Sequence, residues 1–100
     1  MTDVIREGSV ITVKPGQDIV STMVAGFKEE VMTLLGENPT ELCVDMTGVE
    51  MMDSIGIGVL IAIHNSMKKS GGIMRVLHAS DNISKLFKSM RLDQHFNMGK

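Results

Sequence analysis

Residues 44–58 read VDMTGVEMMDSIGIG, and this stretch decides the fold. It begins with Val44, the last residue of the apolar run Leu42 to Val44. It then passes through a polar loop that contains methionines and ends within a long apolar segment. A short continuous apolar run is typical of a central strand that is covered on both faces. The segment from Ile55 to Ile63 is apolar nearly all round, which predicts a deeply packed helix that starts at Ser54. Residues 44–58 are therefore predicted to join a buried strand to a buried helix.

Strands and helices alternate on both sides of this junction. Apolar residues at helical spacing predict a helix over residues 18–35, with Asp18 as its N-cap and Gly36 at its end. In the last helix, the expected buried stripe is Ile83, Leu86, Phe87 and Met90, while residues 92–98 show no clear pattern. The predicted elements, in chain order, are strands at 4–8 and 9–14, a helix at 18–35, a strand at 40–46, a helix at 54–70, a strand at 73–78 and a helix capped by the Ser80 region.

This order predicts the fold class. Strand–helix–strand connections of this length imply parallel neighbouring strands and right-handed crossovers. We expect an α/β fold in which helices pack against one mixed sheet, and a chain of 100 residues is expected to form a single domain over residues 1–100. In such sheets, functional sites gather where strand C-termini meet helix N-termini. That junction is Asp45 through Gly58.

Composition excludes several classes of function. A net charge of -2, with Lys and Arg scattered along the chain, argues against nucleic-acid binding. The longest apolar stretch, residues 55–63, is far shorter than the roughly 20 residues that a membrane-spanning helix requires, so no membrane insertion is expected. The N-terminus lacks the layout of a signal peptide. The single cysteine, Cys43, is predicted to be a small buried hydrophobe, and a reducing cytoplasm is the expected compartment.

Ser54 has two compatible interpretations. As a helix N-cap, its hydroxyl would accept a hydrogen bond from the amide of Gly56 or Ile57, and on physical grounds alone this is the commoner role. As a phosphorylation site, it would place a phosphate at a helix N-terminus, where free amides and the helix dipole favour an anion. The phosphate would add roughly -1.5 to -2 charges beside Asp53. Such a change could switch binding on and off.

Apolar side chains surround this serine. Met51, Met52 and Ile55 would give it an apolar rim, which suits a reversible docking site. Most of the ten methionines are expected to be flexible core filler. We expect one of Met51 and Met52 to face inward, but not both.

Catalytic and cofactor-binding alternatives find weaker support. Gly56 and Gly58 resemble part of a dinucleotide fingerprint, but Ile61 stands where the third glycine should be, so close packing of the helix on the sheet is preferred. Ser54 lacks the Gly-x-Ser-x-Gly context of a nucleophile, and His64 lies about 15 Å away along the helix. No metal-ligand spacing is evident. We therefore expect no cofactor, no metal and no enzymatic activity.

The central motif resembles a known family. The pattern Val49-x-Met51-Met52-Asp53-Ser54-x-Gly56-x-Gly58 is similar to the phosphorylation-site segment of the STAS-domain anti-sigma-factor antagonists. The resemblance extends over nearly the whole chain. The outer features that carry it are Gly71-Gly72 before a strand, followed by Ser80, Ile83, Leu86, Phe87 and Leu92.

The resemblance implies a partner-switching role. The unphosphorylated protein would bind an anti-sigma factor that is also a serine kinase, and so free a sigma factor. The kinase would phosphorylate Ser54 and break the complex, and a metal-dependent phosphatase acting on phospho-Ser54 would restore it. By resemblance, Asp53 is the acidic neighbour, Asp45 is the residue at the strand end, and Gly56 and Gly58 are the glycines of the helix start.

Two positions depart from the family pattern. Residues 15–18 read Pro-Gly-Gln-Asp where the family usually has Gly-Glu-Leu-Asp, and only Gly16 and Asp18 are retained. This region helps form the partner surface in the family, so Asp18 is a candidate contact. Ile55 replaces the usual Ser or Thr, which leaves Ser54 as the only acceptor at the site. Within the same fold, a subunit of a lipid-transport ATPase or of another signalling assembly, bound constitutively, is the alternative.

Overall fold

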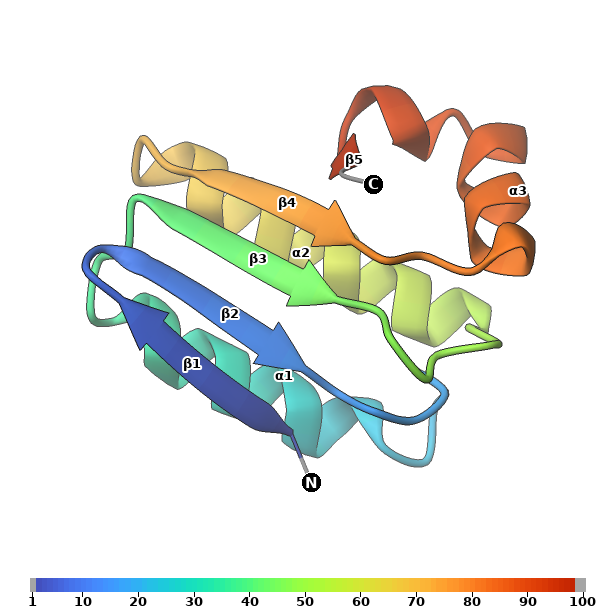
Figure 1. Cartoon of the computed structure of the whole chain (residues 1–100), viewed down its shortest axis with the longest axis horizontal. Coiled ribbons are helices and arrows are strands. Elements are labelled where there is room, and N and C mark those ends of the chain that lie inside the picture. Colours follow the sequence, from blue (N-terminus) through green and yellow to red (C-terminus); the bar gives the residue numbers. More distant parts are fainter. Residues whose placement is uncertain (1, 99–100) are drawn as a thin grey trace.

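A computed structural model describes residues 2–98 and confirms the predicted order of strands and helices (Figure 1). A 3-10 turn and a two-residue strand follow the last helix, in the region that showed no clear pattern. Among the described residues, no helix combines the length and the apolar character needed to cross a membrane. The elements are β1 (Asp3–Glu7), β2 (Val10–Lys14), α1 (Val24–Leu35), β3 (Glu41–Asp45), α2 (Ser54–Lys69), β4 (Ile73–Leu77), α3 (Asp81–Ser89), η1 (Leu92–Gln94) and β5 (Asn97–Met98).

The strands form one mixed sheet in the order β1-β2-β3-β4-β5. The strand β1 runs antiparallel to β2 through a tight turn at Gly8, whose positive φ of 61° suits glycine. The other neighbouring pairs are parallel. The carboxyl ends of β2, β3 and β4 therefore share one edge of the sheet. The predicted α/β fold with a mixed sheet is confirmed.

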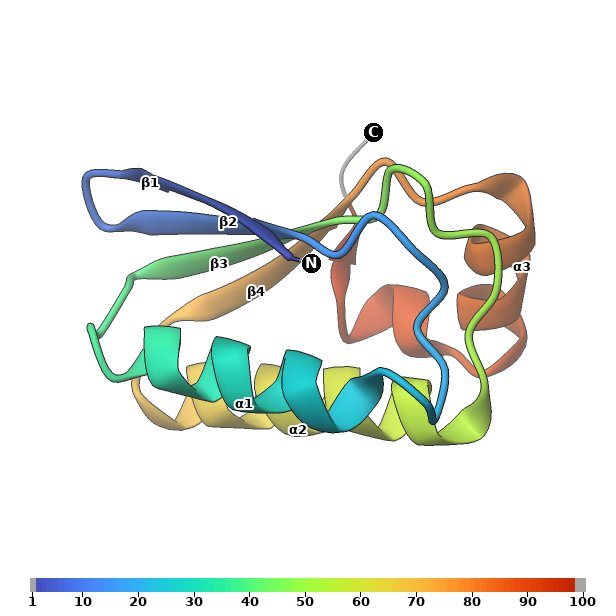
Figure 2. The ribbon, with the colours of Figure 1, turned by 90° about the horizontal axis from the view of Figure 1, so that it is seen from below.

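Helices α1 and α2 cover one face of the sheet, and no helix within residues 2–98 covers the opposite face (Figure 2). Along β3, Leu42 and Val44 belong to the hydrophobic core beneath these helices. Cys43 lies between them in sequence and so points to the other face, because side chains alternate along a strand. It is nevertheless only 5% exposed.

Two charged side chains accompany Cys43 on that face. The Cys43 thiol donates to Glu41 Oε2 at 3.1 Å, and Arg75 Nη2 lies 3.4 Å from Glu41 Oε1. Burial, and then the Glu41 carboxylate, raise the pKa of the thiol to about 11. The predicted buried cysteine is confirmed.

The start of α1 differs from the prediction. The helix begins at Val24, its N-cap residue is Met23, and Asp18 does not cap it. The preceding segment is instead held to the loop before α2 by a parallel bridge between Ile19 and Met52. Ile19 donates its amide to Met51 O at 3.1 Å and accepts from the Asp53 amide at 3.3 Å. These backbone bonds hold residues 18–22 outside the helix.

The C-terminal region is mostly as expected. Ser80 Oγ accepts from the Ile83 amide at 3.2 Å, so the predicted cap of α3 is confirmed. Ile83 and Phe87 are buried, but Met90 is 47% exposed, so its place in the buried stripe was wrong. Met90 follows the last turn of α3, where the chain already leaves the core.

Candidate functional site

Two loops meet beyond the carboxyl ends of β2 and β3 (Figure 1). Residues 15–23 connect β2 to α1, and residues 46–53 connect β3 to α2. Gly16 and Gly48 have positive φ angles of 69° and 85° where the loops approach each other. A Cβ atom on Gly48 would lie 3.4 Å from the carbonyl oxygen of Gly16. Glycine therefore allows close contact between the two loops.

The side chain of Asp18 ties the first loop to the second. Its Oδ1 accepts hydrogen bonds from the amides of Glu50 at 2.9 Å and Met51 at 3.1 Å. These bonds join positions more than 30 residues apart in sequence, and so no local pattern reveals them. Asp18 thus lies at the predicted site, in contact with the loop backbone.

Asp53 makes the second connection between the loops. Its Oδ2 accepts from the amide of Ser21 at 2.8 Å, and its Oδ1 accepts from the amide of Gly56 at 2.8 Å. These amides, Gly56 first, hold the pKa of the Asp53 carboxyl below its ordinary value of 3.8. We call Asp18 and Asp53 the loop clamp. It fixes the backbone at residues 50–56.

Asp53, and not Ser54, is the N-cap of α2. Asp53 has extended backbone angles, φ -95° and ψ 178°, and supplies the capping oxygen. Ser54 is the first helical residue. Its side chain is exposed, and its hydroxyl makes no hydrogen bond within residues 2–98. The prediction that Ser54 caps the helix was wrong because Asp and Ser are equally good caps and the aspartate comes first.

Asp45 acts within its own loop. Its Oδ1 accepts from the Thr47 hydroxyl at 2.7 Å and from the Thr47 amide at 3.0 Å. Burial opposes ionisation of Asp45, but the hydrogen bonds from Thr47 outweigh it and lower the pKa of the carboxyl. Asp45 therefore shapes the turn that leaves β3.

The two glycines of the helix start differ. Gly56 is buried, and a Cβ atom there would collide with the carbonyl oxygen of Ile19. Gly58 is exposed, and a Cβ atom there would meet no atom within 4 Å. Gly56 is closely packed as predicted, but it packs against the first loop and not against the sheet. For Gly58 the packing prediction was wrong.

Apolar side chains flank Ser54 on the open side of the helix. Met51 is 64% exposed and Ile55 is 54% exposed, whereas Met52 is 9% exposed and lies in the core. The expectation that one methionine faces inward is confirmed. We call Met51, Ser54, Ile55 and Gly58 the docking patch. It combines two exposed apolar groups, a hydroxyl and a position without a side chain.

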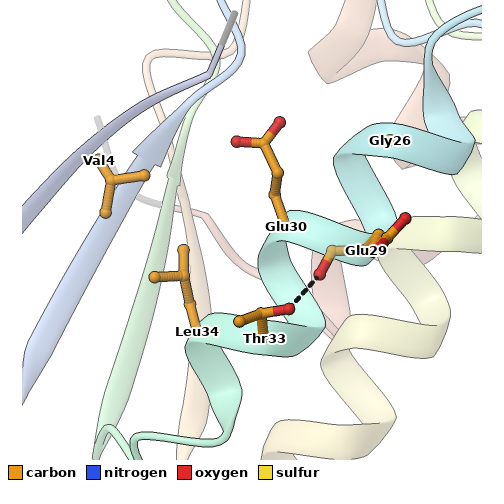
Figure 3. Close-up of a pocket in the computed structure, with 6 residues that line it drawn as sticks. All are labelled: Val4, Gly26, Glu29, Glu30, Thr33 and Leu34. Carbon is orange, nitrogen blue, oxygen red and sulfur yellow. Dashed lines mark hydrogen bonds between the residues drawn. The ribbon is translucent and has the colours of Figure 1, made fainter.

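The docking patch is an open surface. A groove of about 480 Å³ lies elsewhere, between β1 and α1, where Thr33 Oγ1 donates to the Glu29 carbonyl oxygen at 2.9 Å (Figure 3). None of the predicted site residues lines this groove, whose lining includes Val4, Gly26, Glu29, Glu30, Thr33 and Leu34. Within residues 2–98, no group of three metal-ligating side chains gathers either.

Comparison with known proteins identifies the family. Residues 2–100 match the STAS domain family. The chain belongs to the STAS domain family. No curated protein matches the sequence at a significant level. The sequence-based resemblance to STAS domains is confirmed.

Solved structures share the fold at low identity. The Thermotoga maritima protein TM1081 superposes with a TM-score of 0.92 at 19% identity, over 97% of this chain and 84% of that one. An anti-sigma factor antagonist from Mycobacterium paratuberculosis gives a TM-score of 0.87 at 20% identity, over 98% and 83% of the two chains. The phosphorylated form of the Bacillus cell fate determinant SpoIIAA gives 0.78 at 14% identity, over 100% and 92%. This STAS domain thus resembles anti-sigma factor antagonists in fold.

Proposed function

We propose that this STAS domain is an anti-sigma-factor antagonist that binds an anti-sigma factor with serine kinase activity through the docking patch. Phosphorylation of Ser54 releases it, and a serine phosphatase restores binding. The observation that carries the proposal is that Ser54 is exposed, that its hydroxyl bonds to no residue within 2–98, and that its sequence neighbours Met51 and Ile55 are exposed as well.

The docking patch has the features of an interface core. Exposed Met and Ile side chains gain free energy when a partner covers them, at roughly 25 cal/mol per Å² of apolar surface. The loop clamp holds the backbone of Met51 and the start of α2 before any partner arrives. A pre-ordered surface loses less conformational entropy on binding. The absence of a side chain at Gly58 leaves room for a partner to approach α2.

Phosphorylation would change this surface without unfolding the domain. The N-terminus of α2 favours an anion, so a phosphate on Ser54 is tolerated there. The carboxylate of Asp53 already accepts a hydrogen bond from the Gly56 amide at this end of the helix. A phosphate on Ser54 would therefore add its negative charge to that of Asp53. About -1.5 to -2 extra charges between two apolar anchors would have to be desolvated in the complex. Binding is therefore weakened while the fold persists.

Ser54 is proposed as a phosphate acceptor and not as a catalytic nucleophile. Activation of a serine requires a base within hydrogen-bond reach of its hydroxyl. Among residues 2–98 no side chain hydrogen-bonds to it, and both carboxylate oxygens of Asp53 accept from backbone amides. We therefore propose a non-enzymatic, cytoplasmic binding module. Labelling of Ser54 by a serine-reactive phosphonate would contradict this.

A capture experiment with charge variants tests the switch. Wild type, Ser54→Ala and Ser54→Asp are immobilised, and the proteins they retain from native lysate are identified by mass spectrometry. Asn82→Asp is the matched control, because it adds the same charge at an exposed position in the first turn of α3. We expect wild type, Ser54→Ala and Asn82→Asp to retain an ATPase related to histidine kinases. We expect Ser54→Asp to lose it.

The purified partner then provides the direct test. Incubation with ATP should place one phosphate on Ser54 of the wild type and none on Ser54→Ala. The phosphorylated protein should bind the partner more weakly than the unmodified protein. Equal affinity of the phosphorylated and the unmodified protein for the partner would contradict the proposed switch. A transporter ATPase retained equally by all variants would instead favour a constitutive STAS subunit.

A further inference from the structure

A second cavity lies between the later part of α2 and the turn that follows α3. It has a volume of about 310 Å³. It is removed from the docking patch, because His64 follows Ser54 by ten residues, which is about 15 Å along α2. The lining residues that matter here are Ile61, His64, Lys68, Leu92, His95 and Phe96.

The polar side of this cavity is basic. His64 and Lys68 come from one face of α2, and His95 comes from the facing turn. Among the described residues, no carboxylate lines the cavity. Burial, then the charges of Lys68 and His95, lower the pKa of His64. Three basic groups are thus gathered without an acidic partner.

The two ring nitrogens of His64 have different surroundings. Its Nδ1 is buried and has no hydrogen-bond partner within residues 2–98. A proton on a buried, unpaired nitrogen is unfavourable, so the neutral ring carries its proton on Nε2. The ring also packs edge-on against Phe96, with centroids 5.7 Å apart. The neutral ring of His64 therefore carries a single N–H group, on Nε2, at the wall of the cavity.

Asn65 also lines the cavity, and the other lining residues are apolar. Leu92 and Phe96 are buried, and Ile61 is half-buried. Pockets that combine an apolar lining with a few convergent polar groups are typical sites for small molecules, and this volume lies at the lower end of their range. A simple inorganic anion would leave the apolar part without contacts.

We propose that this cavity binds a small amphipathic anion, in which a carboxylate or phosphate group meets His64, Lys68 and His95 and a ring or short aliphatic body packs on Ile61, Leu92 and Phe96. The anionic group supplies a counter-charge for Lys68 and an acceptor for the N–H group of His64. The site is independent of the proposed partner switch.

Four probes separate the parts of this proposal. Phenyl phosphate and benzoate carry both features, inorganic phosphate lacks the apolar body, and benzyl alcohol lacks the charge. Each is titrated into the full chain while the histidine ring resonances are followed by NMR. We expect saturable shifts of His64 and His95 with phenyl phosphate or benzoate, whichever anion the site prefers. Inorganic phosphate and benzyl alcohol should bind at least about tenfold more weakly, the effect of about 1.4 kcal/mol.

Neighbouring lysines provide the matched variants. Lys68 and Lys69 both lie in the last turn of α2 and are both exposed, but only Lys68 lines this cavity. Lys68→Ala should weaken binding of the anionic probes by about tenfold, as expected for loss of a charge-assisted hydrogen bond, and Lys69→Ala should leave it unchanged. Equal binding of benzyl alcohol, equal effects of the two lysine variants, or no saturable shift at millimolar probe would overturn the proposal.

Discussion

The start of α2 has two sides, each with one glycine and one polar side chain, and the surroundings of the two sides are opposite. On one side, Gly56 is pressed against the backbone of Ile19, and Asp53 bonds to two amides. On the other side, Ser54 and Gly58 face open space beside exposed Met51 and Ile55. The packed side fixes where the open side points. The packed side therefore orders the surface that we propose as the docking site.

Replacing Gly56 should have the largest effect on this division. In Gly56→Ala the added methyl group collides with backbone of the first loop, which cannot move aside as a flexible side chain would. We expect a loss of about 3 kcal/mol in the free energy of unfolding. Urea denaturation followed by circular dichroism measures it.

The matched control for this substitution is Gly58→Ala. The new methyl group meets no atom within 4 Å, and alanine is the better helix former, so folding should gain about 0.5 to 1 kcal/mol. If the two alanine variants had equal stability, the contrast between the two sides of the turn would be wrong.

Removing Asp18 should have the next largest effect. Asp18→Ala leaves the amides of Glu50 and Met51 without their acceptor, and only partial replacement by water is expected at this half-buried position. The free energy of unfolding should fall by about 1 to 2 kcal/mol. Hydrogen exchange should accelerate at the amides of Glu50 and Met51 and remain unchanged in β3. Unchanged exchange at both loop amides would remove Asp18 from the loop clamp.

Low pH should weaken the two hydrogen bonds that the Asp53 carboxylate accepts in the loop clamp. Because the folded-state pKa of Asp53 lies below the ordinary 3.8, its contribution to stability is fully present above that value. It is lost as the pH falls below 3.8 and through the folded-state pKa. The amide resonances of Gly56 and Ser21 should therefore shift together in this range, and Asp53→Asn should remove that step. A midpoint above 3.8 would contradict the clamp.

The smallest effect is expected for Ser54. Because its hydroxyl bonds to no described residue, Ser54→Ala should change the free energy of unfolding by no more than about 0.5 kcal/mol. Thermal unfolding of the variant beside the wild type measures this. A fall of about 1 kcal/mol or more in the free energy of unfolding, as expected for a lost N-cap, would indicate that Ser54 caps the helix.

The sequence predicts those features of the fold and site that depend on local periodicity. The apolar run at 42–44 and the apolar segment from Ser54 onward place the strand, the helix and the junction between them. The sequence also predicts that one of Met51 and Met52 faces inward, and the 9% exposure of Met52 confirms it. These signals lie within a few residues of one another, and so a single sequence carries them.

Long-range contacts lie beyond such reasoning. The bonds of Asp18 to Glu50 and Met51 cross more than 30 residues, and helical spacing in residues 18–23 wrongly extends α1 to the N-terminal side. The N-cap of α2 is Asp53 and not Ser54, and this difference does have a local basis in the sequence. An N-cap side chain bonds to the amide two or three residues later, and Gly56 is three residues after Asp53. Because Asp and Ser are both good N-cap residues, this spacing alone does not show whether Asp53 or Ser54 caps the helix.

The shielded thiol of Cys43 has a practical consequence for measuring docking. With a pKa of about 11, only about one thiol in ten thousand is ionised near neutral pH, and thiolate is the form that alkylating dyes attack. A cysteine introduced at the exposed Met51 position would therefore take up a fluorophore in the presence of native Cys43, and its emission would report directly when a partner covers the docking patch.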